Sequence, residues 1–131
     1  KIVAYAKKFS IENGLKIIFP VHPRTKKLVD ELPKFPEFIM PIDPLSYFET
    51  QYLLAKATFV LTDSGGLQKE AYFHRVPCVT LRSETEWVET IDAGWNRLWT
   101  QDNYRGCSEI TDYGHGDAAF KITKQIIEFL G

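Results

Sequence analysis

The sequence predicts an α/β domain with a Rossmann-like parallel sheet that carries helices on both faces. Short apolar segments bounded by turn residues alternate along the chain with longer segments of helical periodicity. The apolar segments are rich in β-branched and aromatic residues, which is typical of parallel strands that are buried on both faces. At 131 residues the chain has the length of one domain with a sizeable core.

The elements follow in order along the chain. A helix is predicted over 2–12, because its apolar residues have helical spacing and Asn13-Gly14 supplies a stop. Ser46 is predicted to cap a later helix, and Ser83 with Glu86 to form a capping box at another. The remaining predictions are strands 16–20, 38–41, 59–62, 76–81 and 96–100, helices 25–32, 45–57, 66–75, 84–93 and 117–130, and a surface connection over 102–116.

Composition excludes several classes of protein. Lys and Arg number 16 and Asp and Glu 17, so neither a general nucleic-acid binder nor a membrane-surface binder is expected. Cys78 and Cys107 show no metal-binding spacing, and a reduced, cytoplasmic setting is expected. No apolar stretch approaches a membrane span and no signal peptide is recognisable. Because the chain opens on Lys1 in a helical pattern, we expect a piece of a longer protein.

The run 59–71 carries the strongest functional pattern. A buried strand leads through the turn Ser64-Gly65-Gly66 into a helix. A helix N-terminus offers unpaired N–H groups and partial positive charge, and glycines let its backbone approach an anion closely. The turn is therefore a candidate phosphate site. Glu70, one helical turn later, could accept hydrogen bonds from the vicinal hydroxyls of a ribose, which suggests a nucleotide or nucleotide-sugar site.

A simpler interpretation remains open for the same residues. Short glycine motifs occur by chance, so the turn could open an ordinary helix. Asp63 or Ser64 would then be a helix cap, and Glu70 a solvated surface carboxylate.

Two further segments follow predicted strands and would meet the turn at one edge of the sheet. His22 could donate a hydrogen bond to a diphosphate oxygen, as could Arg24, although a lone histidine is more often structural. Arg82, Thr85 and Glu86 either face a ligand or belong to a solvated helix start. His74 and His115 receive no role. No nucleophile elbow, Walker lysine, pair of facing carboxylates, metal site or cofactor is predicted.

Three segments resemble the C-terminal half of the UDP-N-acetylglucosamine 2-epimerases. They are TDSGGLQKEA (62–71), VPCVTLRSETEWVET (76–90) and AGWNRL (93–98). The PVHPR run (20–24) and the segment PLSYFETQYLLAKA (44–57) fall where the family places related motifs, so the resemblance spans nearly the whole chain.

The resemblance implies one half of a two-domain, GT-B-like enzyme. Residues 1–131 would form its C-terminal UDP-binding domain, with the N-terminal domain absent from this chain. The reaction would invert C2 of a UDP-N-acetylhexosamine by elimination and re-addition of UDP, without a cofactor or metal. Ser64, Gly65 and Gly66 would bind the diphosphate and Glu70 the ribose, while Arg82, Thr85 and Glu86 would line the rim. His22 would be the catalytic histidine. The parent is expected to be a homodimer, with its proton-transferring carboxylates in the missing domain.

Departures from the family pattern leave the sugar open. Thr50 stands where many relatives have Phe, and Ser83 where an acidic residue is common. The residues at positions 68–73 and 84–90 are more similar to those of the branch that acts on UDP-2,3-diacetamido-2,3-dideoxyglucuronic acid. Two other functions are also open: the nucleotide-sugar-binding half of a GT-B glycosyltransferase, and a non-enzymatic module that senses UDP-sugars.

Overall fold

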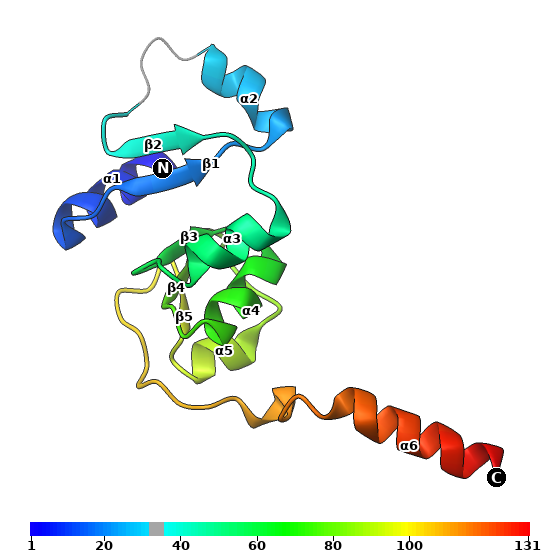
Figure 1. Cartoon of the computed structure of the whole chain (residues 1–131). Coiled ribbons are helices and arrows are strands. Elements are labelled where there is room, and N and C mark those ends of the chain that lie inside the picture. Colours follow the sequence, from blue (N-terminus) through cyan, green and yellow to red (C-terminus); the bar gives the residue numbers. More distant parts are fainter. Residues whose placement is uncertain (32–35) are drawn as a thin grey trace.

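A computed structural model describes residues 1–31 and 36–131. It has the predicted class, with parallel strands and helices in alternation (Figure 1). The elements, in order, are α1 (Ile2–Asn13), β1 (Ile17–Pro20), α2 (Pro23–Asp30), β2 (Ile39–Ile42), α3 (Tyr47–Leu54), β3 (Val60–Thr62), α4 (Gly65–Phe73), β4 (Cys78–Thr80), α5 (Val88–Asp92), β5 (Asn96–Leu98), the 3-10 helix η1 (Thr111–Tyr113) and α6 (Ala118–Leu130). The predicted end of the second helix, at Leu32, lies outside the described residues.

The strands form two parallel sheets where the sequence predicted one. β1 pairs with β2, and β4 lies between β3 and β5. All pairs are parallel, with Ile17 opposite Ile39 in the first sheet and Val60 opposite Cys78 in the second. Figure 1 shows the two-stranded sheet lying apart from the three-stranded one. Among the described residues, no hydrogen-bonded pairing joins β1 to β3, so the two sheets are separate.

The main core lies between the three-stranded sheet and the helices α3 and α4. It is built from small and medium apolar side chains, of which Ala71 and Val79 are fully buried. One cluster joins Leu54, Val60, Ala71, Val76 and Cys78. Burial raises the pKa of the Cys78 thiol to about 12, so this cysteine behaves as a small apolar residue.

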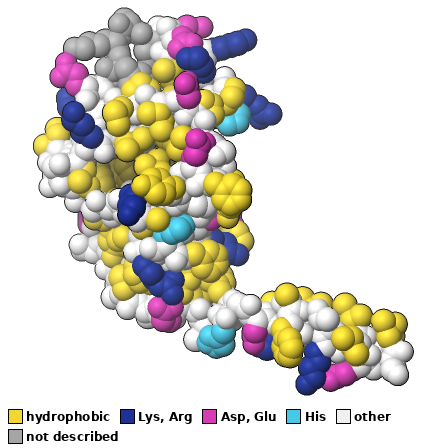
Figure 2. Space-filling view, viewed as in Figure 1, with side chains coloured by type: hydrophobic (Ala, Val, Ile, Leu, Met, Phe, Trp, Pro, Cys, Tyr) yellow, Lys and Arg dark blue, Asp and Glu magenta, His cyan; other side chains and the backbone are white. Residues whose placement is uncertain are grey.

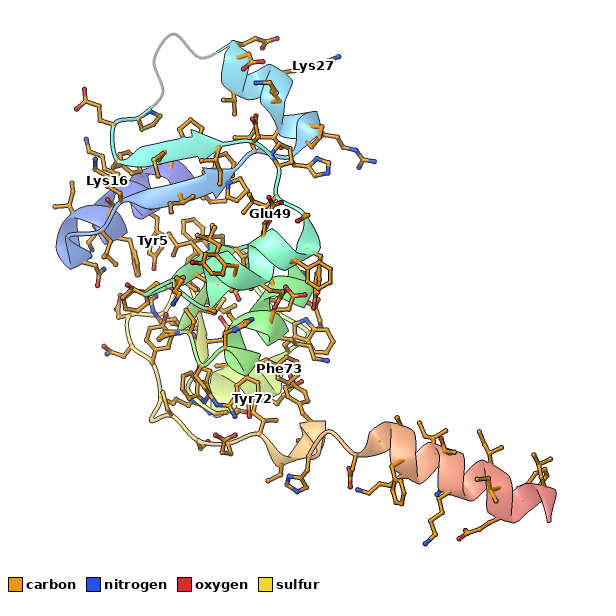
Figure 3. All side chains as sticks on the ribbon, viewed as in Figure 1. Tyr5, Lys16, Lys27, Glu49, Tyr72 and Phe73 are labelled. Carbon is orange, nitrogen blue, oxygen red and sulfur yellow. The ribbon has the colours of Figure 1, made fainter. Side chains whose placement is uncertain are left out.

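Helix α1 attaches the N-terminal part of the chain to this core through aromatic contacts. The ring of Phe9 lies 5.3 Å from that of Phe59, edge to face, and the ring of Tyr5 lies 5.7 Å from that of Trp99. The Tyr5 hydroxyl accepts a hydrogen bond of 2.8 Å from Arg97 in β5. Figure 3 shows Tyr5 extending from α1 toward the three-stranded sheet.

The capping box predicted from the sequence at one helix is absent, whereas the predicted Ser46 cap of α3 is present. Ser46 caps α3 in a complete capping box with Glu49, and the hydrogen bonds from Ser46 lower the pKa of that carboxyl. The predicted box of Ser83 and Glu86 is wrong. Helix α5 begins only at Val88, and its N-cap residue Trp87 makes no side-chain capping bond. The region before it is irregular, so this helix is much shorter than predicted.

The C-terminal part runs across the second sheet and then leaves it. Residues 102–116 are mostly irregular, as predicted, with η1 as a short 3-10 segment. Helix α6 has no buried residue, and Figure 2 shows apolar side chains gathered along it. Among the described residues, no helix is both long and apolar enough to cross a membrane.

Gly94 supports the connection between α5 and β5, and its substitution tests this packing. Its φ is +77°, and an added Cβ would collide with the backbone carbonyls of Arg105 and Gly106. We expect Gly94→Ala to lower the free energy of unfolding by about 3 kcal/mol, from left-handed strain together with overpacking. Chemical denaturation followed by circular dichroism measures this change.

Gly14 provides the matched control for that experiment. It has a similar φ of +63°, but a Cβ there would meet nothing within 4 Å. Gly14→Ala should therefore cost only about 1 kcal/mol. Equal losses in the two variants would contradict the packing of residues 105–106 against Gly94.

Candidate functional site

The turn between β3 and α4 is held by side-chain hydrogen bonds. Ser64 has extended backbone angles and is the N-cap of α4, where its Oγ accepts a hydrogen bond of 3.5 Å from the N–H of Leu67. The Ser64 N–H in turn donates to Oγ1 of the buried Thr62, at 3.0 Å. Ser64 is thus a helix cap, and these bonds fix the direction in which α4 leaves the strand.

The two glycines of the turn have different surroundings. A Cβ on Gly65 would collide with the carboxylate of Glu86 and would lie 3.0 Å from Nε1 of Trp87, whereas a Cβ on Gly66 would meet nothing within 4 Å. Gly65 is therefore required by the close approach of 86–87. The N–H groups of both glycines have no acceptor in the described part of the chain. Both N–H groups therefore remain available as hydrogen-bond donors.

Glu70 lies four residues beyond Gly66, on the same side of α4. The residue is partly exposed, and its carboxylate has neither a hydrogen bond nor an ion pair within residues 1–31 and 36–131. A helix N-terminus with unpaired N–H groups and an unpaired carboxylate one turn later thus lie on the same helix, and their binding of a nucleotide stays a prediction.

The segment between β4 and α5 lies against the start of α4. Arg82 forms an ion pair of 3.2 Å with Glu86, whose carboxylate lies beside Gly65. The Thr85 hydroxyl donates to Oε1 of Gln68 at 2.6 Å and accepts from the N–H of Trp87 at 3.1 Å. Arg82, Thr85 and Glu86 are therefore gathered at the turn.

A buried polar network supports this segment, and sequence reasoning missed it. Gln68 is 1% exposed, and its Oε1 also accepts a hydrogen bond of 3.1 Å from Nδ2 of Asn96. The same Nδ2 donates to the Thr90 hydroxyl at 3.2 Å, and Oδ1 of Asn96 accepts from Thr80 at 2.9 Å. Polar residues inside the apolar strands, Thr80 and Asn96, were the sequence feature that could have indicated it.

Lys69 adds positive charge next to the same segment. Its Nζ lies 4.1 Å from the centre of the Trp87 ring and 4.9 Å from that of Tyr113. The Tyr113 hydroxyl donates to Glu89 at 2.7 Å. Desolvation, reinforced by this carboxylate, raises the pKa of Tyr113 above its ordinary value, which keeps the hydroxyl protonated as a donor.

His22 lies next to the other, two-stranded sheet. It follows β1 as the N-cap of α2, is exposed, and its Nδ1 accepts a hydrogen bond of 3.2 Å from the N–H of Arg24. No hydrogen bond or ion pair among the described residues joins His22 or Arg24 to α4. His22 and the glycine turn each follow the carboxyl end of a strand, β1 and β3 respectively. That the two lie close together in the site stays a prediction.

Parallel strands, with a glycine turn that opens a helix at a strand's carboxyl end, define a Rossmann-like α/β protein. Comparison with known families makes the assignment narrower. The family model of UDP-N-acetylglucosamine 2-epimerase matches residues 1–127, and the chain belongs to this family. The match favours the epimerase interpretation over the glycosyltransferase alternative.

Individual relatives agree with this assignment. A UDP-N-acetylglucosamine 2-epimerase homolog of Methanococcus maripaludis is 44% identical over 130 residues, covering 87% of this chain and 36% of the relative. The UDP-2,3-diacetamido-2,3-dideoxy-D-glucuronate 2-epimerase of Pseudomonas aeruginosa is 46% identical over 86 residues, which cover 66% of this chain and 24% of that enzyme. Identity to relatives therefore does not distinguish the two sugars.

Solved structures extend the likeness to the fold. The UDP-GlcNAc 2-epimerase of Methanocaldococcus jannaschii matches with a TM-score of 0.75 and 32% identity, over 97% of this chain and 40% of that one. The same enzyme has been solved in complex with UDP-GlcNAc and UDP, and this structure matches with a TM-score of 0.73. The chain thus spans well under half the length of these relatives.

Gln68 offers a direct test of the buried network. Gln68→Leu keeps the side-chain volume but leaves the Thr85 hydroxyl and one Asn96 donor bond without an acceptor. We expect the free energy of unfolding to fall by about 2 kcal/mol, as measured by denaturant titration. Gln125→Leu on the exposed helix α6 is the control and should change it by less than about 0.5 kcal/mol. A neutral Gln68→Leu would contradict the network.

Proposed function

We propose that this chain is the UDP-binding half of a UDP-sugar 2-epimerase. The observation that carries the proposal is the pairing of free N–H groups at Gly65 and Gly66 with the unpartnered carboxylate of Glu70 one turn away. Backbone donors suit a diphosphate, and a carboxylate suits the two hydroxyls of a ribose. A related enzyme solved with UDP-GlcNAc and UDP supports UDP as the nucleotide.

Each predicted residue then has a role in holding the nucleotide sugar. Ser64, Gly65 and Gly66 bind the diphosphate, and Glu70 binds the ribose. Arg82, Thr85 and Glu86 form the rim beside them, where the Arg82 guanidinium adds charge to the phosphate site. His22 acts near the phosphates as the catalytic histidine.

The reaction inverts C2 of a UDP-N-acetylhexosamine. A proton leaves C2 while the C1–oxygen bond to UDP breaks, which produces a glycal and free UDP. UDP then adds back to C1 as a proton returns to the opposite face of C2. The chain's contribution is electrostatic, because donors around the diphosphate stabilise negative charge as UDP departs. The carboxylates that move the proton belong to the N-terminal domain.

The remaining assignments follow from this role. Residues 1–131 are the C-terminal part of a two-domain, homodimeric enzyme of the cytoplasm, where the free thiols Cys78 and Cys107 stay reduced. The 131-residue chain alone does not turn over a UDP-sugar. Epimerase activity of the isolated chain, followed by the NMR signals of the two C2 epimers, would contradict this division of labour.

Calorimetric titration with UDP tests the nucleotide site. Glu70→Ala removes the proposed acceptor of the ribose hydroxyls, and a charged hydrogen-bonding pair contributes about 1.5–3 kcal/mol. We therefore expect UDP affinity to fall roughly 10- to 100-fold. Gly65→Val places a branched side chain against Glu86 and the diphosphate position, and should abolish binding.

Two controls separate the site from general effects. Glu128→Ala removes a carboxylate from the exposed helix α6 and should leave UDP affinity unchanged. Uridine, which lacks phosphates, should bind the unmodified chain more weakly than UDP does. The affinity for uridine should still fall in Glu70→Ala. If UDP binds equally well to Glu70→Ala, the ribose role of Glu70 is wrong.

A further inference from the structure

The indole of Trp87 carries a buried hydrogen-bond donor that lacks an acceptor. Its Nε1 atom is buried, and no described residue accepts a hydrogen bond from it. A tryptophan N–H can only donate, and a buried one usually has a partner, because a hydrogen bond left unmade costs free energy. An unpartnered donor at this position therefore calls for an explanation.

The position of this donor is the first indication of its role. A Cβ built on Gly65 would lie 3.0 Å from Nε1 of Trp87, so the indole lies against the first residue of α4. The N–H groups of Gly65 and Gly66 also lack acceptors in the described part of the chain. Three donors without partners are thus gathered at one turn, two from the backbone and one from a side chain. Converging donors of this kind are suited to a phosphate group.

The contacts of Trp87 hold it beside the turn. Its N–H donates to the Thr85 hydroxyl at 3.1 Å, and its carbonyl accepts from the N–H of Thr90 at 3.1 Å and from the hydroxyl of Thr90 at 2.7 Å. Nζ of Lys69 lies 4.1 Å from the centre of its ring. The indole is therefore restrained in this position before any ligand binds, and a restrained donor loses less conformational freedom on binding.

The side chain that shares this position is weakly held. The Glu86 carboxylate lies beside the same face of Gly65, and its partner Arg82 is 3.2 Å away. The side chains of Arg82 and Glu86 are 39% and 49% exposed, and an ion pair with this exposure contributes little to stability. An incoming anion can therefore displace the carboxylate and reach the indole N–H.

We propose that Trp87 is a ligand-binding residue, whose indole N–H donates to a phosphate oxygen of a diphosphate bound at the turn of Gly65 and Gly66. The inference rests on the proposed function, because it requires a phosphate-bearing ligand at this turn. It adds a side-chain donor from the segment after β4 to the backbone donors of α4. The bound diphosphate then bridges these two parts of the chain.

Trp87→Phe tests this role, because it removes the N–H but keeps an aromatic ring next to Lys69. In calorimetric titrations, the affinity for inorganic pyrophosphate and for UDP should fall roughly tenfold, as expected for the loss of one hydrogen bond to a charged group. The denaturation midpoint of the free chain should stay the same or rise, because the variant lacks an unpartnered buried donor. A purely structural role for Trp87 predicts the opposite pattern, with a lower midpoint and an unchanged affinity.

Trp95 provides the matched control. Its Nε1 donates to the carbonyl of Ser108 at 2.8 Å, so this indole already has a partner within the chain. Trp95→Phe should therefore lower the denaturation midpoint and leave the affinity for pyrophosphate unchanged.

The NMR signals of the indole N–H groups give a direct readout. The chain has three tryptophans, and the signal that disappears in Trp87→Phe belongs to Trp87. When pyrophosphate is added to the unmodified chain, this signal should move downfield by more than the other two, because its N–H gains a charged acceptor.

Three outcomes would overturn the proposal. They are that Trp87→Phe binds pyrophosphate as tightly as the unmodified chain, that the Trp87 signal does not move at saturation, or that the unmodified chain binds neither pyrophosphate nor UDP. The proposed function is tested separately through Glu70. If Glu70→Ala weakens UDP binding while Trp87→Phe does not, only the role of Trp87 is wrong. If Trp87→Phe weakens pyrophosphate binding while Glu70→Ala leaves UDP binding unchanged, Trp87 keeps its role and the proposed ribose site is wrong.

Discussion

The hydrogen bonds of Gln68 are the constraint on which the arrangement of the site depends. This side chain is buried in α4 but reaches the segment before α5 through Thr85 and reaches β5 through Asn96. It therefore links one helix, one strand and one irregular segment at a single oxygen atom. In a low-dielectric interior, such a network holds its members in one geometry because any displacement leaves a buried polar group without a partner. The approach of Glu86 to Gly65 follows from it.

Irregular segments normally have many conformations, and the connection after β4 has little regular structure of its own. Its position is set instead by the bonds of Thr85 and by the packing of Trp87 under Lys69. The glycine at 65 is the complementary feature, since any Cβ would displace this segment. Fold and site are thus coupled: the segment that carries Arg82, Thr85 and Glu86 is held in place by the buried side chain of Gln68.

The fold class, the order of the elements and the glycine turn could be predicted from the sequence, because apolar periodicity and helix capping depend on residues only a few positions apart. Ser46 and Glu49 illustrate this, since their bonds span three residues. The capping box expected of Ser83 and Glu86 has the same spacing, but Arg82 binds the Glu86 carboxylate instead. The pairing of Gln68 with Asn96 spans 28 positions, so no local pattern could reveal it. The division into two sheets was missed for a related reason: apolar runs identify strands but not their neighbours.

The ion pair of Arg82 and Glu86 beside Gly65 has a consequence for how selective the turn can be. A carboxylate near a helix N-terminus is a resident anion that already profits from the positive end of the dipole. Under the proposed function, an incoming anion would compete with this carboxylate for the positive end of the helix. A diphosphate carries more charge and more acceptor atoms, and it can also recruit the Arg82 that Glu86 releases. The Glu86 carboxylate would then favour the binding of anions of higher charge over monovalent anions at this turn.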